Sequence, residues 1–214
     1  MDELKFAVIG NPVSHSLSPD IHLFFASQFQ LERYTYNKIK SNENDFERDI
    51  NDFFKNGGVG LNVTVPFKGL AYNLCDELDQ SAGLCKSVNT VLIDSGKLIG
   101  HSTDGQGLID DFLHKEITLE DSKILIIGAG GSAASIISSL LFHGKIKKIS
   151  ILNRTKSNAL RLLDLFKTNR LLMHEEGDEY DIVINTTPIS MNVDDIILPP
   201  ELIMNKPICY DLFY

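Results

Sequence analysis

The chain has 214 residues, 43% of them hydrophobic, so it can bury a full core and is long enough for one large or two small domains. Its 20 Lys and Arg against 29 Asp and Glu give a net charge of -9, which argues against a nucleic-acid-binding surface. The three cysteines have no paired spacing and no apolar run reaches membrane-spanning length. We therefore expect buried thiols in a cytoplasmic protein that binds no membrane.

The first half of the chain predicts strands and helices that alternate. Ser18-Pro19 provides a helix cap followed by a proline at the first helical position. Hydrophobic spacing and turn residues place the strands at residues 6–9, 34–39, 59–65, 88–93 and 97–99. The last two form a hairpin across Asp94-Ser-Gly96. The same criteria place the helices at residues 18–29, 46–54, 67–75 and 77–84.

Aromatic and histidine side chains near the N-terminus have no spacing typical of a metal or cofactor site. Helical periodicity groups three phenylalanines of the first helix into the expected core: Phe24, Phe25 and Phe29. No metal-type spacing connects the three nearby histidines, which we interpret as packing or rim residues: His15, His22 and His101.

Beyond residue 104 the pattern becomes strictly alternating, which places a domain boundary near Asp104. The predicted domains are residues 1–104 and 105–214. The second contains helices at 105–113, 131–143 and 157–166, and strands at 124–127, 149–152, 171–173, 182–184 and 207–210. Strands that alternate with helices predict an α/β fold with a doubly wound parallel sheet.

A glycine-rich loop follows the apolar strand at 124–127 and precedes a helix of small residues. Gly128 permits a tight turn, Gly130 lets a pyrophosphate approach the backbone, and Ala133 allows close helix packing. The helix N-terminus then faces the phosphates. This order of elements favours a dinucleotide site over an ordinary glycine turn.

The end of the next strand favours NADP over NAD. NAD-binding sheets usually carry Asp or Glu there, whereas this chain has Asn153-Arg154-Thr155. An arginine can bind the 2′-phosphate of NADP with two charge-assisted hydrogen bonds, and a carboxylate would repel it. The alternative is that these residues only lead into a helix capped by Thr155.

Four motifs together resemble the shikimate dehydrogenase family. They are Gly10-Asn-Pro-Val-Ser-His-Ser16-Leu-Ser18-Pro19, Asn62-Val-Thr64-Val-Pro-Phe-Lys68, Ser87-Val-Asn89-Thr90 and Ser102-Thr-Asp104-Gly105. Gly128–Ser132, Asn153–Thr155, Asn185-Thr-Thr187 and the last six residues continue the match in the same order. The resemblance implies an N-terminal α/β substrate domain and a Rossmann-like NADP domain. It also implies NADPH-dependent reduction of 3-dehydroshikimate to shikimate, on the route to chorismate and the aromatic amino acids.

The resemblance assigns a role to each motif. Ser16 and Ser18 bind the substrate carboxylate, which Tyr214 closes over, and Thr64 and Asn89 hold ring hydroxyls. Lys68 and Asp104 are the catalytic pair. Reduction of a ketone leaves an alkoxide, which Lys68 stabilises and protonates, and Asp104 orients the Lys68 side chain and could accept a proton in the reverse direction. The cofactor residues are Gly128, Ala129, Gly130, Gly131, Ser132, Ala133, Asn153, Arg154, Thr155 and Thr187.

Taken singly, these residues have ordinary interpretations. A lysine after Val-Pro-Phe is typical of a solvated helix, and Asp104-Gly105 of a turn. The chain also departs from the family pattern. Asn158 stands where the family often has a second arginine near the 2′-phosphate. Arg161, one helical turn further on, could take the role of that arginine. Ser102 replaces an asparagine, Lys86 a small residue, and Pro188 removes a backbone donor.

The largest departure is at the C-terminus, where the family continues with helices that return to the first domain and carry a substrate-binding glutamine. A truncated chain, an incomplete record and a naturally short relative each explain the end at Tyr214. We expect apolar surface of the first domain to be uncovered. Two further functions stay open: a quinate/shikimate dehydrogenase that uses NAD, and a chain that binds nucleotide or shikimate without catalysis. The sequence leaves the oligomeric state open.

Overall fold

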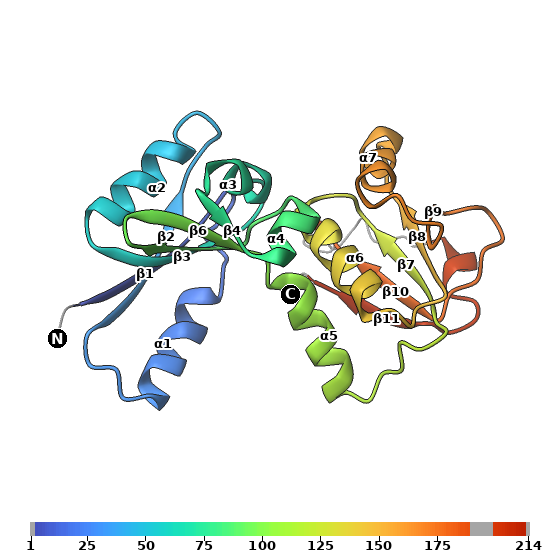
Figure 1. Ribbon diagram of the computed structural model, residues 1–214. Coiled ribbons are helices and arrows are strands. Elements are labelled where there is room, and N and C mark those ends of the chain that lie inside the picture. The colour runs from blue at the N-terminus through green and yellow to red at the C-terminus, as the bar shows by residue number, and fades with distance from the viewer. Residues whose placement is uncertain (1–2, 189–198, 213–214) are drawn as a thin grey trace. The chain divides into compact units, whose positions relative to one another are not determined.

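The computed structural model describes residues 3–188 and 199–212. The chain divides into two compact units, Met1–Thr103 (unit 1) and Asp104–Tyr214 (unit 2) (Figure 1). Each unit has a β-sheet of its own. Within residues 3–188 and 199–212, no helix combines the length and apolarity that crossing a membrane requires.

The sheet of unit 1 has six strands in the order β2-β1-β3-β5-β6-β4. Their bounds are β1 Leu4–Gly10, β2 Tyr34–Lys40, β3 Gly58–Val63, β4 Glu77–Leu78, β5 Thr90–Asp94 and β6 Lys97–His101. Strand β1 pairs in parallel with β2 and β3, whereas β5 is antiparallel to β3 and β6. The start of β5 therefore lies at the same sheet edge as the ends of β1, β3 and β6.

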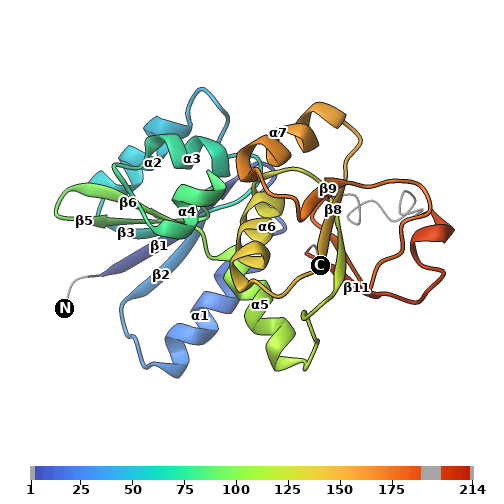
Figure 2. The ribbon, with the colours of Figure 1, turned by 45° about the vertical axis from the view of Figure 1, so that its right-hand side comes forward.

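Four helices accompany this sheet: α1 Ser18–Gln28, α2 Phe46–Lys55, α3 Lys68–Leu74 and α4 Gln80–Cys85. Helices α2 and α3 lie on one side of the sheet and α1 on the other (Figures 1 and 2). Helix α2 buries Phe46, Ile50 and Phe54, which are four residues apart and therefore share one face. They pack against the inward-facing side chains of β1 and β3, such as Ile9 and Leu61.

The prediction of a helix over residues 77–84 is wrong at its start. Glu77 and Leu78 form β4, which pairs in parallel with β6, and the helix begins only at Gln80. The cause is Asp79, whose carboxylate accepts a hydrogen bond from Ala82 N at 2.7 Å and so caps α4. The predicted strand 88–93 likewise begins later, at Thr90.

The expectation that the phenylalanines of α1 lie in the core is also wrong. Phe24, Phe25 and Phe29 are 61%, 49% and 76% exposed, and Ala26 is the buried residue of this helix. Apolar residues occur all around α1, so periodicity alone could not select its buried face. The cysteines differ in the same way: Cys85 is buried, Cys75 is half-buried and Cys209 is exposed.

Unit 2 contains the predicted parallel Rossmann-like sheet, in the order β11-β10-β7-β8-β9. Its strands are β7 Lys123–Ile127, β8 Lys148–Leu152, β9 Leu171–Met173, β10 Ile182–Asn185 and β11 Ile208–Asp211, and all four pairings are parallel. The helices in the described part of this unit are α5 Asp104–His114, α6 Gly131–His143, α7 Lys156–Phe166 and the short 3-10 helix η2 Pro200–Leu202.

The core of unit 2 forms on both faces of β7. Helices α5 and α6 pack against each other, and α6 buries Ile136, Ile137 and Leu140 completely (Figure 2). Leu125 belongs to a second cluster with Tyr180, Val183 and Leu202 of η2. Because successive residues of a strand point to opposite faces, the fully buried Ile124 and Ile126 point to the face opposite Leu125.

Candidate active site

Three of the predicted site residues come together at one edge of the sheet of unit 1. Val63 N donates a hydrogen bond to Asn89 O at 2.8 Å, and Val88 N donates to Lys68 O at 3.0 Å. The segment around Asn89 therefore lies against both the end of β3, where Thr64 follows, and the start of α3, where Lys68 lies. The antiparallel direction of β5 makes this possible.

Lys68 is a buried lysine. Lys68 is only 9% exposed, although it is the first residue of α3. Pro66 and Phe67 directly precede the helix. The neighbouring Phe67, which is 1% exposed, packs against Phe46 with a ring-centroid distance of 4.9 Å. Burial distinguishes Lys68 from the solvated helix lysine that the local sequence suggests, since lysines are almost never buried without a partner or a function.

Ser16 and Ser18 are adjacent. Ser16 Oγ donates to Ser18 Oγ at 3.1 Å and accepts from Ser18 N at 3.3 Å. Ser18 is the first residue of α1 and Leu17 holds the capping position, so the predicted side-chain cap by Ser18 is absent from the described structure. Two hydroxyl groups at the start of this helix, whose second residue is Pro19, suit a carboxylate ligand.

A polar cluster beside these residues was missed by the sequence analysis. Tyr36 is 5% exposed, donates to Asn62 Oδ1 at 2.7 Å, and stacks on the ring of His22 with centroids 4.4 Å apart. Asn62 Nδ2 donates in turn to Thr90 Oγ1 at 3.2 Å. Burial raises the pKa of the Tyr36 hydroxyl and lowers the pKa of His22. The signal in the sequence was Asn62, a polar residue within an apolar strand.

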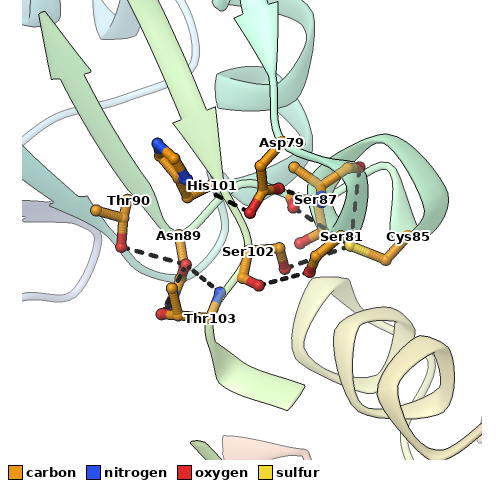
Figure 3. A network of polar contacts seen from close by, with 10 residues as sticks. Asp79, Ser81, Cys85, Ser87, Asn89, Thr90, His101, Ser102 and Thr103 are labelled. Atoms are coloured by element: carbon orange, nitrogen blue, oxygen red, sulfur yellow. Dashed lines mark hydrogen bonds and ion pairs between the residues drawn. The ribbon is translucent and has the colours of Figure 1, made fainter. Parts of the chain in front are cut away.

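Asn89 is connected to the segment that leads to Asp104. Its Oδ1 accepts from Thr103 N at 2.9 Å and its Nδ2 donates to Thr103 Oγ1 at 2.9 Å (Figure 3). Thr90 Oγ1 also donates to Asn89 Oδ1, at 3.3 Å. The side-chain orientation of Asn89 is therefore fixed by protein partners on two sides.

Asp104 is the first residue of α5 and of unit 2. The next residue, Gly105, donates its N–H to Ser135 Oγ of α6 at 3.0 Å. A Cβ on Gly105 would lie 2.3 Å from Ser135 O, so only glycine permits this close approach of α5 and α6. The bond to Ser135 fixes the start of the helix that carries Asp104.

The glycine loop of unit 2 has a tight turn and an open approach. Gly128 has a φ of +115°, and its N–H donates to Leu152 O at 2.9 Å. Gly130 precedes α6 with a φ of -89°, and a Cβ there would meet no atom within 4 Å. Ala133 is 0% exposed, as close packing of α6 on the sheet requires. The open side of Gly130 and the N-terminus of α6 together fit a pyrophosphate.

Arg154 lies at the end of β8, one residue after Asn153. Its side chain is exposed, and Asn153 Nδ2 donates to Thr155 O at 2.8 Å, which shapes the turn into α7. Thr155 occupies the capping position of α7 without a side-chain capping hydrogen bond. The turn into α7 and the position of Thr155 agree with the alternative that this motif leads into a helix, apart from the missing side-chain cap.

Thr187 belongs to a closed turn after β10. Thr187 N and Oγ1 both donate to Asn185 Oδ1, at 3.0 and 2.7 Å, and Asn185 Nδ2 donates to Thr187 O at 3.1 Å. Thr186 Oγ1 donates to Ile127 O at 2.8 Å, which ties this turn to the strand before the glycine loop. Tyr214, the remaining predicted site residue, lies outside the described residues.

Comparisons with known proteins assign the family. The family described as shikimate dehydrogenase substrate binding domain matches residues 8–91, and that described as shikimate / quinate 5-dehydrogenase matches residues 112–197. A shikimate dehydrogenase (NADP(+)) from Legionella pneumophila (strain Lens) is 44% identical over 211 residues, which cover 98% of this chain and 78% of the relative. The chain belongs to the shikimate dehydrogenase family.

Solved structures of the family have the same fold. Shikimate 5-dehydrogenase from Thermus thermophilus, in complex with NADP(H) and shikimate, aligns with a TM-score of 0.87 and 30% identity over 98% of this chain and 78% of that one. Shikimate dehydrogenase from Aquifex aeolicus aligns with a TM-score of 0.87 and 27% identity over 99% of this chain and 79% of that one. The predicted family and α/β architecture are thus confirmed.

Proposed function

We propose that this chain catalyses the NADP-dependent interconversion of 3-dehydroshikimate and shikimate, a step towards chorismate and the aromatic amino acids. The observation that carries the proposal is the 44% identity to a curated shikimate dehydrogenase (NADP(+)) across 98% of the chain. In this proposal residues 1–104 are the substrate domain and residues 105–214 the NADP domain. A cytoplasmic location of the reaction is part of this proposal.

The substrate is held by hydroxyl and amide groups of unit 1. The paired hydroxyls of Ser16 and Ser18 bind its carboxylate at the N-terminus of α1. Thr64 and Asn89 bind ring hydroxyls, and the bonds from Thr103 hold the amide of Asn89 in a fixed orientation. Tyr214, which lies outside the described residues, completes the proposed set of substrate-binding residues.

Lys68 and Asp104 carry the chemistry. Bound NADPH supplies the hydride. Reduction of the ketone leaves an alkoxide, which the Lys68 ammonium stabilises and protonates. Its 9% exposure supports this role, because few water molecules can compete for the ammonium. Asp104 orients Lys68 and accepts a proton in the reverse direction.

The glycine loop and the motif after β8 hold the cofactor. Gly128–Ala133 surround the pyrophosphate, which approaches the open side of Gly130. Asn153, Arg154 and Thr155 bind the adenosine end, where the exposed guanidinium of Arg154 meets the 2′-phosphate. Thr187 contributes from the turn after β10.

The test is turnover of the purified chain with NADPH and 3-dehydroshikimate, followed by NADPH absorbance. We expect turnover in the wild type and a fall in kcat of at least about 1,000-fold in Lys68→Met, because the alkoxide loses its proton donor. Lys55→Met, at the exposed C-terminal end of α2, is the matched control and keeps full activity. A wild-type chain that binds NADP without turnover contradicts the proposal and favours binding without catalysis.

A shikimate dehydrogenase that uses NAD is the second candidate. One family structure, from Listeria monocytogenes, is described in complex with shikimate and NAD, and aligns at 26% identity. The same assay with NAD, and with quinate in the reverse direction, separates the two. The exposed Arg154 predicts that kcat/KM is higher with NADP.

A further inference from the structure

Two residues directly before Asp104, Ser102 and Thr103, are held by side chains from other parts of unit 1 (Figure 3). Thr103 is bound by Asn89, as described above. Ser102 is 4% exposed and is bound twice. Ser81 Oγ donates to its carbonyl oxygen at 2.6 Å, and Cys85 Sγ donates to its hydroxyl at 3.3 Å.

The donor residue Ser81 lies on a well-anchored helix. It follows Gln80 in the first turn of α4, which Asp79 caps. Asp79 N donates to Gly100 O at 2.9 Å, and Asp79 Oδ2 lies 3.4 Å from His101 Nδ1. The start of α4 is therefore fixed to the end of β6, and Ser81 presents its hydroxyl from a rigid support.

We propose that Ser81 is a positioning residue for the reaction: its hydroxyl fixes the Ser102 carbonyl and thereby the path of the chain into Asp104. On the other side of Asp104, the N–H of Gly105 is fixed by Ser135. Thr103 and Asp104 thus lie between two anchored peptide groups, Ser102–Thr103 and Asp104–Gly105, which together restrict the backbone of Asp104. The role in catalysis rests on the proposed function.

Ser81 can be tested apart from substrate binding, unlike Asn89. Ser81→Ala removes the hydroxyl, and Ser81→Thr keeps it. The matched control is Ser27→Ala, because Ser27 Oγ also donates to a backbone carbonyl, that of Phe24, at 2.6 Å, but in the exposed part of α1. We expect Ser81→Ala to lower kcat about tenfold with KM for shikimate changed less than twofold. Ser81→Thr restores kcat to within twofold, and Ser27→Ala has wild-type kinetics.

A purely structural role gives a different result. Ser81→Ala then has a lower melting temperature, while its kcat, measured well below that temperature, stays within twofold of the wild type. That outcome overturns the proposal.

Hydrogen exchange separates this inference from the proposed function. We expect the Thr103 amide to exchange about tenfold faster in Ser81→Ala than in the wild type, with amides of α2 unchanged. Unchanged exchange at Thr103 overturns the proposal whatever the activity. Faster exchange in an inactive chain supports the anchoring of the segment before Asp104 by Ser81. It shows that the proposed function has failed and that the hydrogen bond from Ser81 to Ser102 has not.

Discussion

The side chain of Thr186 occupies the place that a Cβ on Gly128 would need: its Oγ1 lies 2.3 Å from that position. Gly128 also has a φ of +115°, which side chains rarely tolerate. Thr186 Oγ1 cannot move freely, since it donates to Ile127 O at 2.8 Å. The loop therefore requires glycine at this position for two separate reasons.

We predict that Gly128→Ala lowers the free energy of unfolding by roughly 2–4 kcal/mol, as the sum of backbone strain and overpacking. Urea unfolding measures this loss. Gly177→Ala is the control, because Gly177 has a φ of +87° and open space around a Cβ. It should lose only about 1 kcal/mol from backbone strain. Equal losses in the two variants would show that the Thr186 contact is unimportant.

Gly130→Ala separates ligand binding from folding. A Cβ at residue 130 meets nothing within 4 Å and the φ is -89°, so we expect the free energy of unfolding to fall by only about 0.5–1 kcal/mol, because alanine is less favourable than glycine at the capping position of α6. The added methyl group projects into the space proposed for the pyrophosphate. The Kd for NADP, measured by calorimetry, should rise at least about tenfold. An unchanged Kd contradicts this location of the pyrophosphate.

Arg154→Ala should weaken NADP binding without affecting NAD. Loss of one charge-assisted contact costs about 1.5–3 kcal/mol, so the Kd for NADP rises roughly ten- to a hundredfold. The Kd for NAD, which lacks the 2′-phosphate, stays within twofold. Arg161 is exposed on α7, the helix that follows Arg154. Arg161→Ala tests whether this residue makes a second contact with the 2′-phosphate. A comparable loss there would assign Arg161 the role that Asn158 cannot fill.

His22 makes stability depend on pH. Burial lowers its pKa in the fold below the unfolded value of 6.5, so the unfolded chain binds more protons between these two values. Its contribution is fully present above pH 6.5 and is lost as the pH falls through 6.5 towards the folded pKa. The free energy of unfolding should therefore rise as the pH increases from about 5 to 7.5. We predict that this rise, measured by urea unfolding, is smaller in His22→Gln than in the wild type. An identical pH profile would contradict the prediction.

Local patterns were sufficient to predict most of the strands, though not β4, and the glycine loop. Val59, Leu61 and Val63 alternate with small or polar residues, and this period is typical of a strand. Gly128 follows an apolar strand directly, and the turn with positive φ is observed there. In each case, the determining residues are close together in the sequence.

Other features depend on contacts between distant residues and could not be predicted in this way. The two residues of β4 form a strand because β6 offers a free edge, which no local pattern of Glu77 and Leu78 reveals. Tyr36 meets Asn62 only because β2 and β3 flank β1 in a particular register. Burial of Lys68 likewise depends on the segment before β5 packing over α3.

The reversed direction of β5 has a practical consequence. Because Asn89 precedes this five-residue strand, the turn at Ser95-Gly96 lies about 17 Å away, at the opposite edge of the sheet. Both turn residues are exposed and have a positive φ, which is typical of a tip that tolerates insertion. A short epitope or fluorescent peptide inserted between Ser95 and Gly96 would label this unit at a point distant from Asn89.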